Sequence, residues 1–240
     1  MPKATAGEVI AKPSRPLLIY RWIVFLLAGF YSVYQITTSD YFAPGGPFRF
    51  LTIWALLCSF FAASRLIALA EGRSTRRWDG FISMTAVLNA MVVFLYWRLY
   101  FDDPTSVTRN GQLQVWWLEY YLHLVGPLLQ WIDALFFHRA FRAPKRATLW
   151  LLGLISAYLI WAELFVQRFN SRPLGSVTNG LPYPFLNNMT FDDRLMFYMV
   201  QAASALMLLA AFSILAWGIN RLSRPSRAPA APSDNPDKAA

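Results

Sequence analysis

The sequence predicts an all-α integral membrane bundle of six transmembrane helices, with both termini in the cytoplasm. The first observation is composition: 56% of the 240 residues are hydrophobic and only 15% are charged, whereas a soluble domain carries about 25% charged residues. The second is that the apolar residues gather into six runs, each long enough to cross a bilayer as a helix. The third is an uneven division of lysine and arginine between alternate connectors.

The six runs follow one another along the chain, separated by polar connectors. Lipid offers no hydrogen-bond partner to a free backbone group, so a spanning run must be a helix or a strand of a closed barrel. These runs are too long for barrel strands and lack their two-residue alternation. Helices are therefore predicted at residues 17–38, 48–69, 80–101, 114–136, 148–169 and 195–219.

Local signals support these elements in order. The first run is too long for a signal peptide and lacks a small-residue cleavage site. The second follows Gly45-Gly46-Pro47, and proline suits the first helical position. Trp78 precedes the third run and Trp150 lies near the start of the fifth, and both suit a membrane interface. Pro127 predicts a kink in the fourth, and a capping box at residues 190–193 opens the sixth.

Lysine and arginine residues predict the orientation. Fourteen of them lie in the N-terminal segment, the second and fourth connectors and the tail, whereas five lie in the connectors on the other side. Cytoplasmic connectors carry the excess of positive charge, which explains the formal charge of +9 without a nucleic acid partner. We expect a basic cytoplasmic segment at 1–16, the membrane domain at 17–220 and a disordered cytoplasmic tail at 221–240.

Cysteine and histidine are too scarce for a disulfide or a zinc site. Cys58 is the only cysteine, and His123 and His138 are the only histidines. The sequence also contains no dinucleotide-binding, P-loop or metalloprotease motif. We therefore expect neither a metal nor a cofactor.

Polar side chains inside the apolar runs are functional candidates, because each costs free energy in lipid. Thr52, Glu119, His123 and Glu163 fall in the halves of their spans that are predicted to face the outer leaflet. Polar groups from several helices at one depth predict a cavity there.

Two of these residues suit general base chemistry. Glu119 and His123 are four residues apart and share a helix face, and a carboxylate beside an imidazole can fix its tautomer and raise its basicity. Pro127 has no N–H for the carbonyl of His123, so the helix should kink beside the imidazole. The alternative is a kink that serves packing, next to a structural histidine bonded to Glu119.

Thr52 is the candidate nucleophile. It lies in the first turns of the second span, near the positive end of the helix dipole, where a developing oxyanion is stabilised. A threonine hydroxyl attacks only when a base removes its proton, and His123 is the intramembrane imidazole available for this. The alternative is that Thr52 hydrogen-bonds to a carbonyl one turn earlier in its own helix.

Two acidic residues are expected to form ion pairs. Glu163 has Arg98 as its expected partner at the outer side. Asp133, near the cytoplasmic end of the fourth span, is expected to pair with Arg139 or Arg142.

Three short motifs resemble those of the androgen-induced-gene family of multi-span membrane proteins. They are Gly45-Gly46-Pro-Phe-Arg-Phe-Leu51-Thr52 before the second span, His123-Leu-Val-Gly-Pro127-Leu-Leu in the fourth, and Tyr183-Pro184-Phe185-Leu186 in the last outer loop. The resemblance covers about residues 17–220. It implies a threonine hydrolase of fatty acid esters of hydroxy fatty acids, with the required threonine and histidine at Thr52 and His123. The bacterial members imply a location in a bacterial cytoplasmic membrane.

Our leading hypothesis is a membrane-embedded hydrolase whose partner is a membrane lipid or fatty ester. Thr52 and His123 are catalytic, and Glu119 and Glu163 support them. An alternative is a non-enzymatic protein that binds or transports a small amphiphile or ion through a cluster of Glu119, Glu163 and His123. A third hypothesis is a structural or regulatory partner protein without a site.

Overall fold

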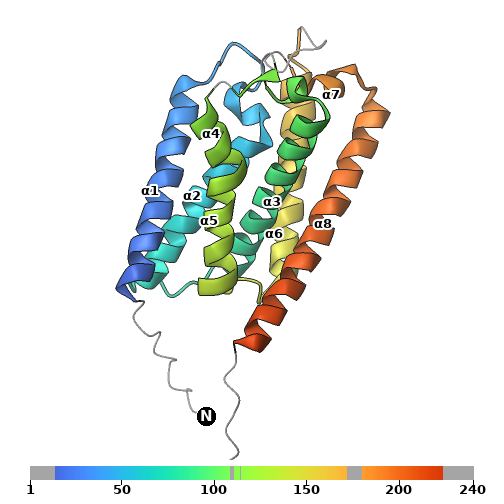
Figure 1. Cartoon of the computed structure of the whole chain (residues 1–240). Helices are drawn as coiled ribbons and strands as arrows, with labels where there is room; N and C mark the ends of the chain where they lie inside the picture. Colours follow the sequence, from blue (N-terminus) through green and yellow to red (C-terminus); the bar gives the residue numbers. More distant parts are fainter. Residues whose placement is uncertain (1–13, 109–110, 114, 172–179, 224–240) are drawn as a thin grey trace, which may run out of the picture.

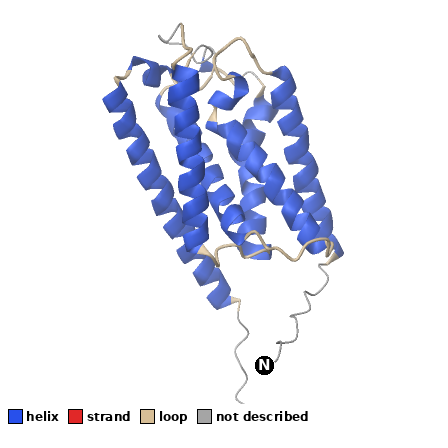
Figure 2. Ribbon diagram, turned by 180° about the vertical axis from the view of Figure 1, so that it is seen from behind, coloured by secondary structure: helices blue, strands red, loops and turns tan. Residues whose placement is uncertain are grey.

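The computed structural model describes residues 14–108, 111–113, 115–171 and 180–223. Within these residues the protein is helical and contains no β-strand (Figure 2). Most of the N-terminal segment and most of the tail that the sequence assigns to the cytoplasm lie outside the described residues.

The long helices run side by side as a bundle (Figure 1). The first residue of α1 and the last residue of α8 lie at the same end, and the short helix α7 lies at the other, which we call the α7 end (Figure 1). The helices are α1 (Arg15–Thr38), α2 (Leu51–Ala70), α3 (Asp79–Asp102), α4 (Trp116–Tyr120), α5 (Gly126–Ile132), α6 (Pro144–Trp161), α7 (Pro184–Asn188) and α8 (Phe191–Leu222). Shorter 3₁₀ turns are η1 (Gly46–Arg49) and η2 (Pro104–Ser106), and π-helical turns are η4 (Tyr121–Val125), η5 (Asp133–Phe137) and η6 (Ala162–Gln167).

Five of the predicted spans are confirmed as helices long and apolar enough to cross a membrane. They are α1, α2, α3, α8 and the continuous helix Pro144–Gln167 formed by α6 and η6. The helix α8 begins at Phe191, four residues before the predicted run, because the hydroxyl of Thr190 accepts a hydrogen bond from the Asp193 N–H at 3.3 Å and caps its first turn. The predicted capping residue is thus confirmed.

The predicted fourth span has a different local structure. Residues 116–137 are helical throughout, but the π-helical turn η4 separates α4 from α5, and a second π-helical turn, η5, follows α5. This segment packs against α1, α2 and α3, so it belongs to the bundle.

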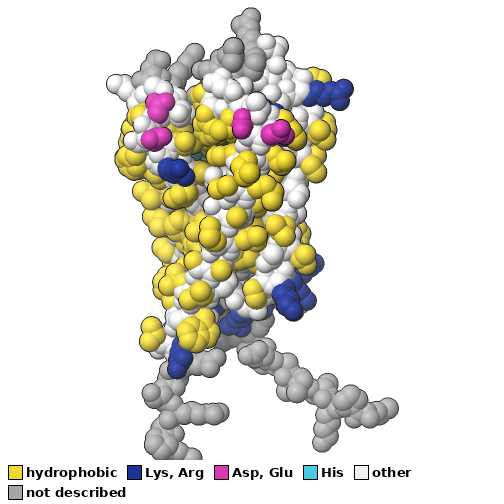
Figure 3. Space-filling model, turned by 90° about the vertical axis from the view of Figure 1, so that its right-hand side faces the viewer, with side chains coloured by type: hydrophobic (Ala, Val, Ile, Leu, Met, Phe, Trp, Pro, Cys, Tyr) yellow, Lys and Arg dark blue, Asp and Glu magenta, His cyan; other side chains and the backbone are white. Residues whose placement is uncertain are grey.

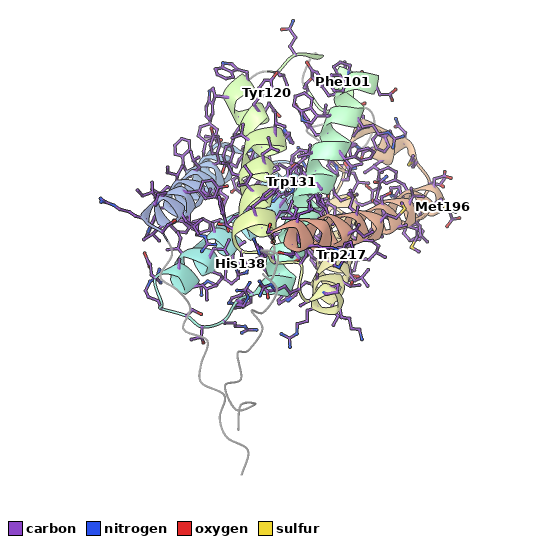
Figure 4. The ribbon with its side chains drawn as sticks, turned by 60° about the horizontal axis from the view of Figure 1, so that its bottom comes forward. Phe101, Tyr120, Trp131, His138, Met196 and Trp217 are labelled. Atoms are coloured by element: carbon purple, nitrogen blue, oxygen red, sulfur yellow. The ribbon has the colours of Figure 1, made fainter. Side chains whose placement is uncertain are left out.

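The helix α3 forms the centre of the bundle. In the most apolar stretch of α3, 83% of the residues are buried, whereas the corresponding share is 22% in α1 and 17% in α8. The helix α3 contacts α2, α5, α6 and α8. The outward faces of the surrounding helices are apolar: Leu149 is 72% exposed and Met196 is 67% exposed, and Met196 lies at the outer edge of the bundle (Figure 4). Apolar side chains cover the middle of the face in Figure 3, with charged side chains toward its ends. This surface fits lipid, and the protein is a multi-pass membrane protein.

A buried ion pair joins the first helix to the fourth segment. Arg21 donates from Nε and Nη2 to the two carboxylate oxygens of Asp133, both at 2.8 Å, and both side chains are almost fully buried. The expected pairing of Asp133 with Arg139 or Arg142 is therefore wrong. Those two residues follow Asp133 in the connector, whereas Arg21 reaches the carboxylate from the neighbouring helix.

Candidate active site

A pocket of about 200 Å³ opens at the α7 end of the bundle. Its walls come from α1, the start of α2, α3, the fourth segment and the loop before α7. The lining residues are Gln35, Ser39, Pro47, Phe50, Thr52, Ile53, Tyr96, Val107, Glu119, Leu122, His123, Pro182 and Tyr183. Thr52 and Leu122 also line a smaller cavity of about 20 Å³, so Thr52 lies between the two spaces.

Two glycines place Thr52 at the start of its helix. Gly45 and Gly46 have φ angles of 78° and 50°, which glycine adopts without strain. A Cβ on Gly45 would lie 2.6 Å from Val166 Cγ2, so the close approach also requires glycine. The chain then turns through η1, and α2 begins at Leu51. Thr52 is thus the second residue of α2.

The position of Thr52 leaves backbone donors near its hydroxyl. N–H groups in a first helical turn have no partner within the helix. The Ile53 N–H donates to the Phe50 carbonyl at 3.0 Å, whereas the Thr52 N–H has no acceptor within the described part of the chain. A carbonyl oxygen that gains negative charge beside Thr52 would therefore meet a free donor at the positive end of the helix dipole.

A proline shapes the helix around His123. Pro127 has no N–H, so the His123 carbonyl loses its usual i+4 partner. The helix instead forms the π-helical turn η4, in which the Gly126 N–H donates to the carbonyl of Tyr121. The indole Nε1 of Trp97 donates to the His123 carbonyl at 2.8 Å and satisfies the freed group. The distortion is thus stabilised from α3.

The imidazole of His123 is fixed in orientation and in tautomer. Its Nδ1 lies 3.1 Å from the Glu119 carbonyl oxygen and 3.1 Å from Glu119 Oε2. Both are acceptors, so Nδ1 carries the proton and Nε2 presents a lone pair in the neutral ring. The ring of Tyr96 stacks on the imidazole with centroids 3.5 Å apart and planes within 4°, which holds the plane of the ring.

The lone pair of Nε2 faces the threonine hydroxyl. Thr52 Oγ1 lies 3.5 Å from His123 Nε2, a length typical of a nucleophile and base before a substrate tightens the contact. His123 is 7% exposed and buried in the protein, yet both residues line the pocket. The arrangement can therefore activate a hydroxyl beside a space that admits a ligand.

A comparison with protein families identifies the chain. The model of the family described as FAR-17a/AIG1-like protein matches residues 16–216. The chain belongs to this family. The match confirms the resemblance to the androgen-induced-gene family that the three motifs indicated. The comparisons with curated proteins and with solved structures gave no match.

Three of the four predicted site residues of this FAR-17a/AIG1-like protein come together. Thr52, His123 and Glu119 surround the pocket, whereas Glu163 does not line it. Glu163 instead accepts two hydrogen bonds from Arg194, each at 2.9 Å, and one from the Tyr198 hydroxyl at 2.7 Å. The partner of Glu163 is thus Arg194 on α8, and the expected partner Arg98 is wrong.

Sequence reasoning did not assign two aromatic residues of this family member to the site. Tyr96 stacks on the imidazole and Trp97 holds its carbonyl. Both lie near the end of an apolar run, where aromatic residues usually indicate the membrane interface. For Trp97 a signal exists in the missing N–H of Pro127, since a freed carbonyl inside a membrane requires a donor. No such signal indicates Tyr96.

The described residues include no group of three or more His, Cys, Asp and Glu side chains that could hold a metal ion. The polar side chains that line the pocket with Thr52 are those of Gln35, Ser39, Tyr96, Glu119, His123 and Tyr183. These groups suit proton transfer and acyl transfer, and they derive from the protein alone.

Proposed function

We propose that this protein is a membrane-embedded hydrolase of lipid or fatty acid esters, with Thr52 as nucleophile and His123 as base. The observation that carries the proposal is the 3.5 Å distance between Thr52 Oγ1 and His123 Nε2, in a histidine whose Nδ1 faces Glu119. The pocket at this contact supports the proposal, because a catalytic pair requires access to substrate.

The reaction proceeds through an acyl-threonine intermediate. Thr52 Oγ1 attacks the ester carbonyl carbon while its proton passes to His123 Nε2. The carbonyl oxygen becomes an oxyanion, which the N-terminal end of α2 stabilises. The C–O bond to the alcohol then breaks, and the imidazolium returns the proton to the departing alcohol oxygen. Water repeats the sequence on the acyl-threonine, so that the carboxylic acid leaves and Thr52 regains its hydroxyl.

Glu119 is a positioning residue in this mechanism. Its carboxylate lies 3.1 Å from His123 Nδ1, so it stabilises the imidazolium that forms when Nε2 accepts the threonine proton. Its backbone carbonyl contacts the same nitrogen at 3.1 Å. The tautomer is thus held by the backbone, and the charge is balanced by the side chain.

The membrane topology is the second part of the proposal. Residues 116–137 form a sixth crossing, because an even number of crossings returns the end of α8 to the side where α1 begins, and Figure 1 shows these ends together. The excess of lysine and arginine on the connectors at that side favours the cytoplasm, with the segments 1–16 and 221–240 also there. The proposed location is a bacterial cytoplasmic membrane.

The catalytic assignment is tested by labelling the purified protein in detergent with a fluorophosphonate probe and by assaying ester turnover. Thr52→Val keeps the shape of the side chain and removes the hydroxyl, so labelling and turnover should both be lost. Thr52→Ser should retain both. Thr37→Ala is the matched control, since that hydroxyl bonds to the Val33 carbonyl of its own helix at 2.8 Å. Turnover by Thr52→Val equal to that of the wild type would exclude Thr52 as nucleophile.

A further inference from the structure

A second cavity lies next to the pocket of Thr52. It has a volume of about 80 Å³ and lies between α3, α6 and α8. Its lining is almost entirely aliphatic and aromatic, with Gln201 as the amide among the lining side chains. The hydroxyls of Tyr158 and Tyr198 are engaged by the Arg49 carbonyl at 2.8 Å and by Glu163 at 2.7 Å. These tyrosines therefore present mainly their ring surfaces to the cavity, which we call the apolar cleft.

The apolar cleft adjoins the catalytic pocket, and the two spaces share part of their lining. Pro182 and Tyr183 line both spaces, and Leu51, the residue before Thr52, lines the apolar cleft. A group bound in the cleft therefore lies beside Leu51, next in sequence to the nucleophile.

The shared lining is held by its own hydrogen bonds. The Leu181 N–H donates to Asn187 Oδ1 at 3.0 Å, and Asn187 Nδ2 donates to the Leu181 carbonyl at 3.4 Å. A Cβ on Gly180 would lie 2.6 Å from Asn170 Nδ2, so this close packing requires glycine.

We propose, on the basis of the proposed ester hydrolysis, that the acyl chain of the substrate binds in the apolar cleft, past Pro182 and Tyr183. The alcohol part of the ester then remains in the pocket with Glu119 and His123, where polar groups can meet it. In this placement the apolar half of an amphiphilic ester contacts apolar side chains and the polar half contacts polar side chains. The carbonyl group lies between the two halves, at Thr52.

The cleft sets the length of the acyl chain. Its lining extends from Leu88 to Leu95 on α3 and from Leu151 to Ala162 on α6. At about 1.5 Å per residue these stretches are about 10 Å and about 16 Å long. An extended chain of tetrahedral carbon atoms advances about 1.3 Å per carbon, so the two lining stretches are as long as a chain of about 8 to 12 carbons.

A chain-length series tests this site. The substrates are p-nitrophenyl esters from acetyl to hexadecanoyl, and the readout is the ratio of decanoyl to acetyl kcat/KM within each protein. Ala202→Phe places a ring in the cleft, since Ala202 lines it, and this ratio should fall about tenfold or more. Ala203→Phe is the matched control, because Ala203 is exposed on the lipid-facing surface of the same helix, and its ratio should equal that of the wild type. An equal ratio in the two variants would overturn the proposal.

A second measurement separates failure of the cleft from failure of the enzymatic proposal. The probe is a ten-carbon acyl ester with a diazirine at its terminal carbon, photolysed in Thr52→Val protein, which does not consume it. Cross-links should map to cleft residues such as Leu88 and Leu151, and Ala202→Phe should suppress them. Cross-links at lipid-facing residues such as Met196 in the same yield would show nonspecific insertion and overturn the site. If the wild type cleaves no ester while the cross-links remain in the cleft, the hydrolase proposal fails and the acyl site stands.

Discussion

Replacing Glu119 with glutamine separates the two functions of that residue. The amide keeps the size of the side chain and removes the negative charge 3.1 Å from His123 Nδ1. The backbone carbonyl of Glu119 lies at the same distance from Nδ1, so the tautomer of the imidazole should survive. The variant therefore measures the electrostatic contribution alone.

The structure gives the size of the expected effect. Two unit charges 3.1 Å apart attract each other by about 5 kcal/mol at an effective dielectric constant of about 20. The Glu119 side chain is 25% exposed, and water and the replacement amide recover part of this energy. A net loss of about 2 to 3 kcal/mol in transition-state stabilisation lowers kcat by about 30- to 150-fold.

The assay is steady-state hydrolysis of a decanoyl ester in detergent, with KM expected to change little because the charge develops only in the transition state. Glu71→Gln is the matched control: its side chain is 26% exposed and pairs with Arg73 away from the pocket. A kcat within twofold of the wild type for Glu119→Gln would refute the electrostatic role. A kcat as low as that of Thr52→Val would also refute the separation, because it would show that the side chain fixes the tautomer.

Three further variants test how the fold supports the site. Trp97→Phe removes the donor at 2.8 Å from the His123 carbonyl. An unsatisfied buried carbonyl costs about 1 to 3 kcal/mol, so both Tm and kcat should fall. An unchanged kcat would show that the π-helical turn keeps its shape without this hydrogen bond. Arg21→Met leaves Asp133 buried without its partner. The free energy of unfolding should fall by about 3 kcal/mol, with little change in KM. A Tm equal to that of the wild type would contradict this. Gly45→Ala adds a Cβ at a φ of 78°, at a cost of at least about 1 kcal/mol. It should lower kcat by displacing the start of α2. An unaltered kcat and Tm would show that the turn adjusts freely.

Most of the fold follows from the apolar runs because a lipid environment restricts the choices. Five runs became helices within a few residues of their predicted ends. The start of α8 lies four residues before the predicted run, and Asp192 and Asp193 belong to its first turn although they interrupt the apolar pattern. A hydropathy pattern identifies the segment that suits lipid, whereas the helix continues to its capping residue in the polar region.

Pairing between helices could not be predicted in the same way. The partners of Glu163 and Asp133 lie 31 and 112 residues away along the chain. Which faces meet depends on the rotation of each helix about its axis, and such apolar helices carry little amphipathic signal to fix that rotation. Thr52 and His123 could still be proposed as a pair from the sequence, because few polar side chains occur in these runs and the chemistry of a threonine nucleophile requires a base.

The candidate site depends on backbone irregularities rather than on polar side chains alone. A regular helix directs every carbonyl to its own N–H partner, and a membrane enforces this pairing. Pro127 breaks the pairing at His123 itself, and the resulting π-helical turn is the kind of distortion that frequently marks functional sites. On the facing helix, Gly45 and Gly46 turn the chain so that α2 begins one residue before Thr52. The two irregularities meet at the contact between the Thr52 hydroxyl and His123 Nε2. Helix packing would not require both distortions at one contact, whereas acyl transfer requires a base at one distortion and free N–H donors at the other.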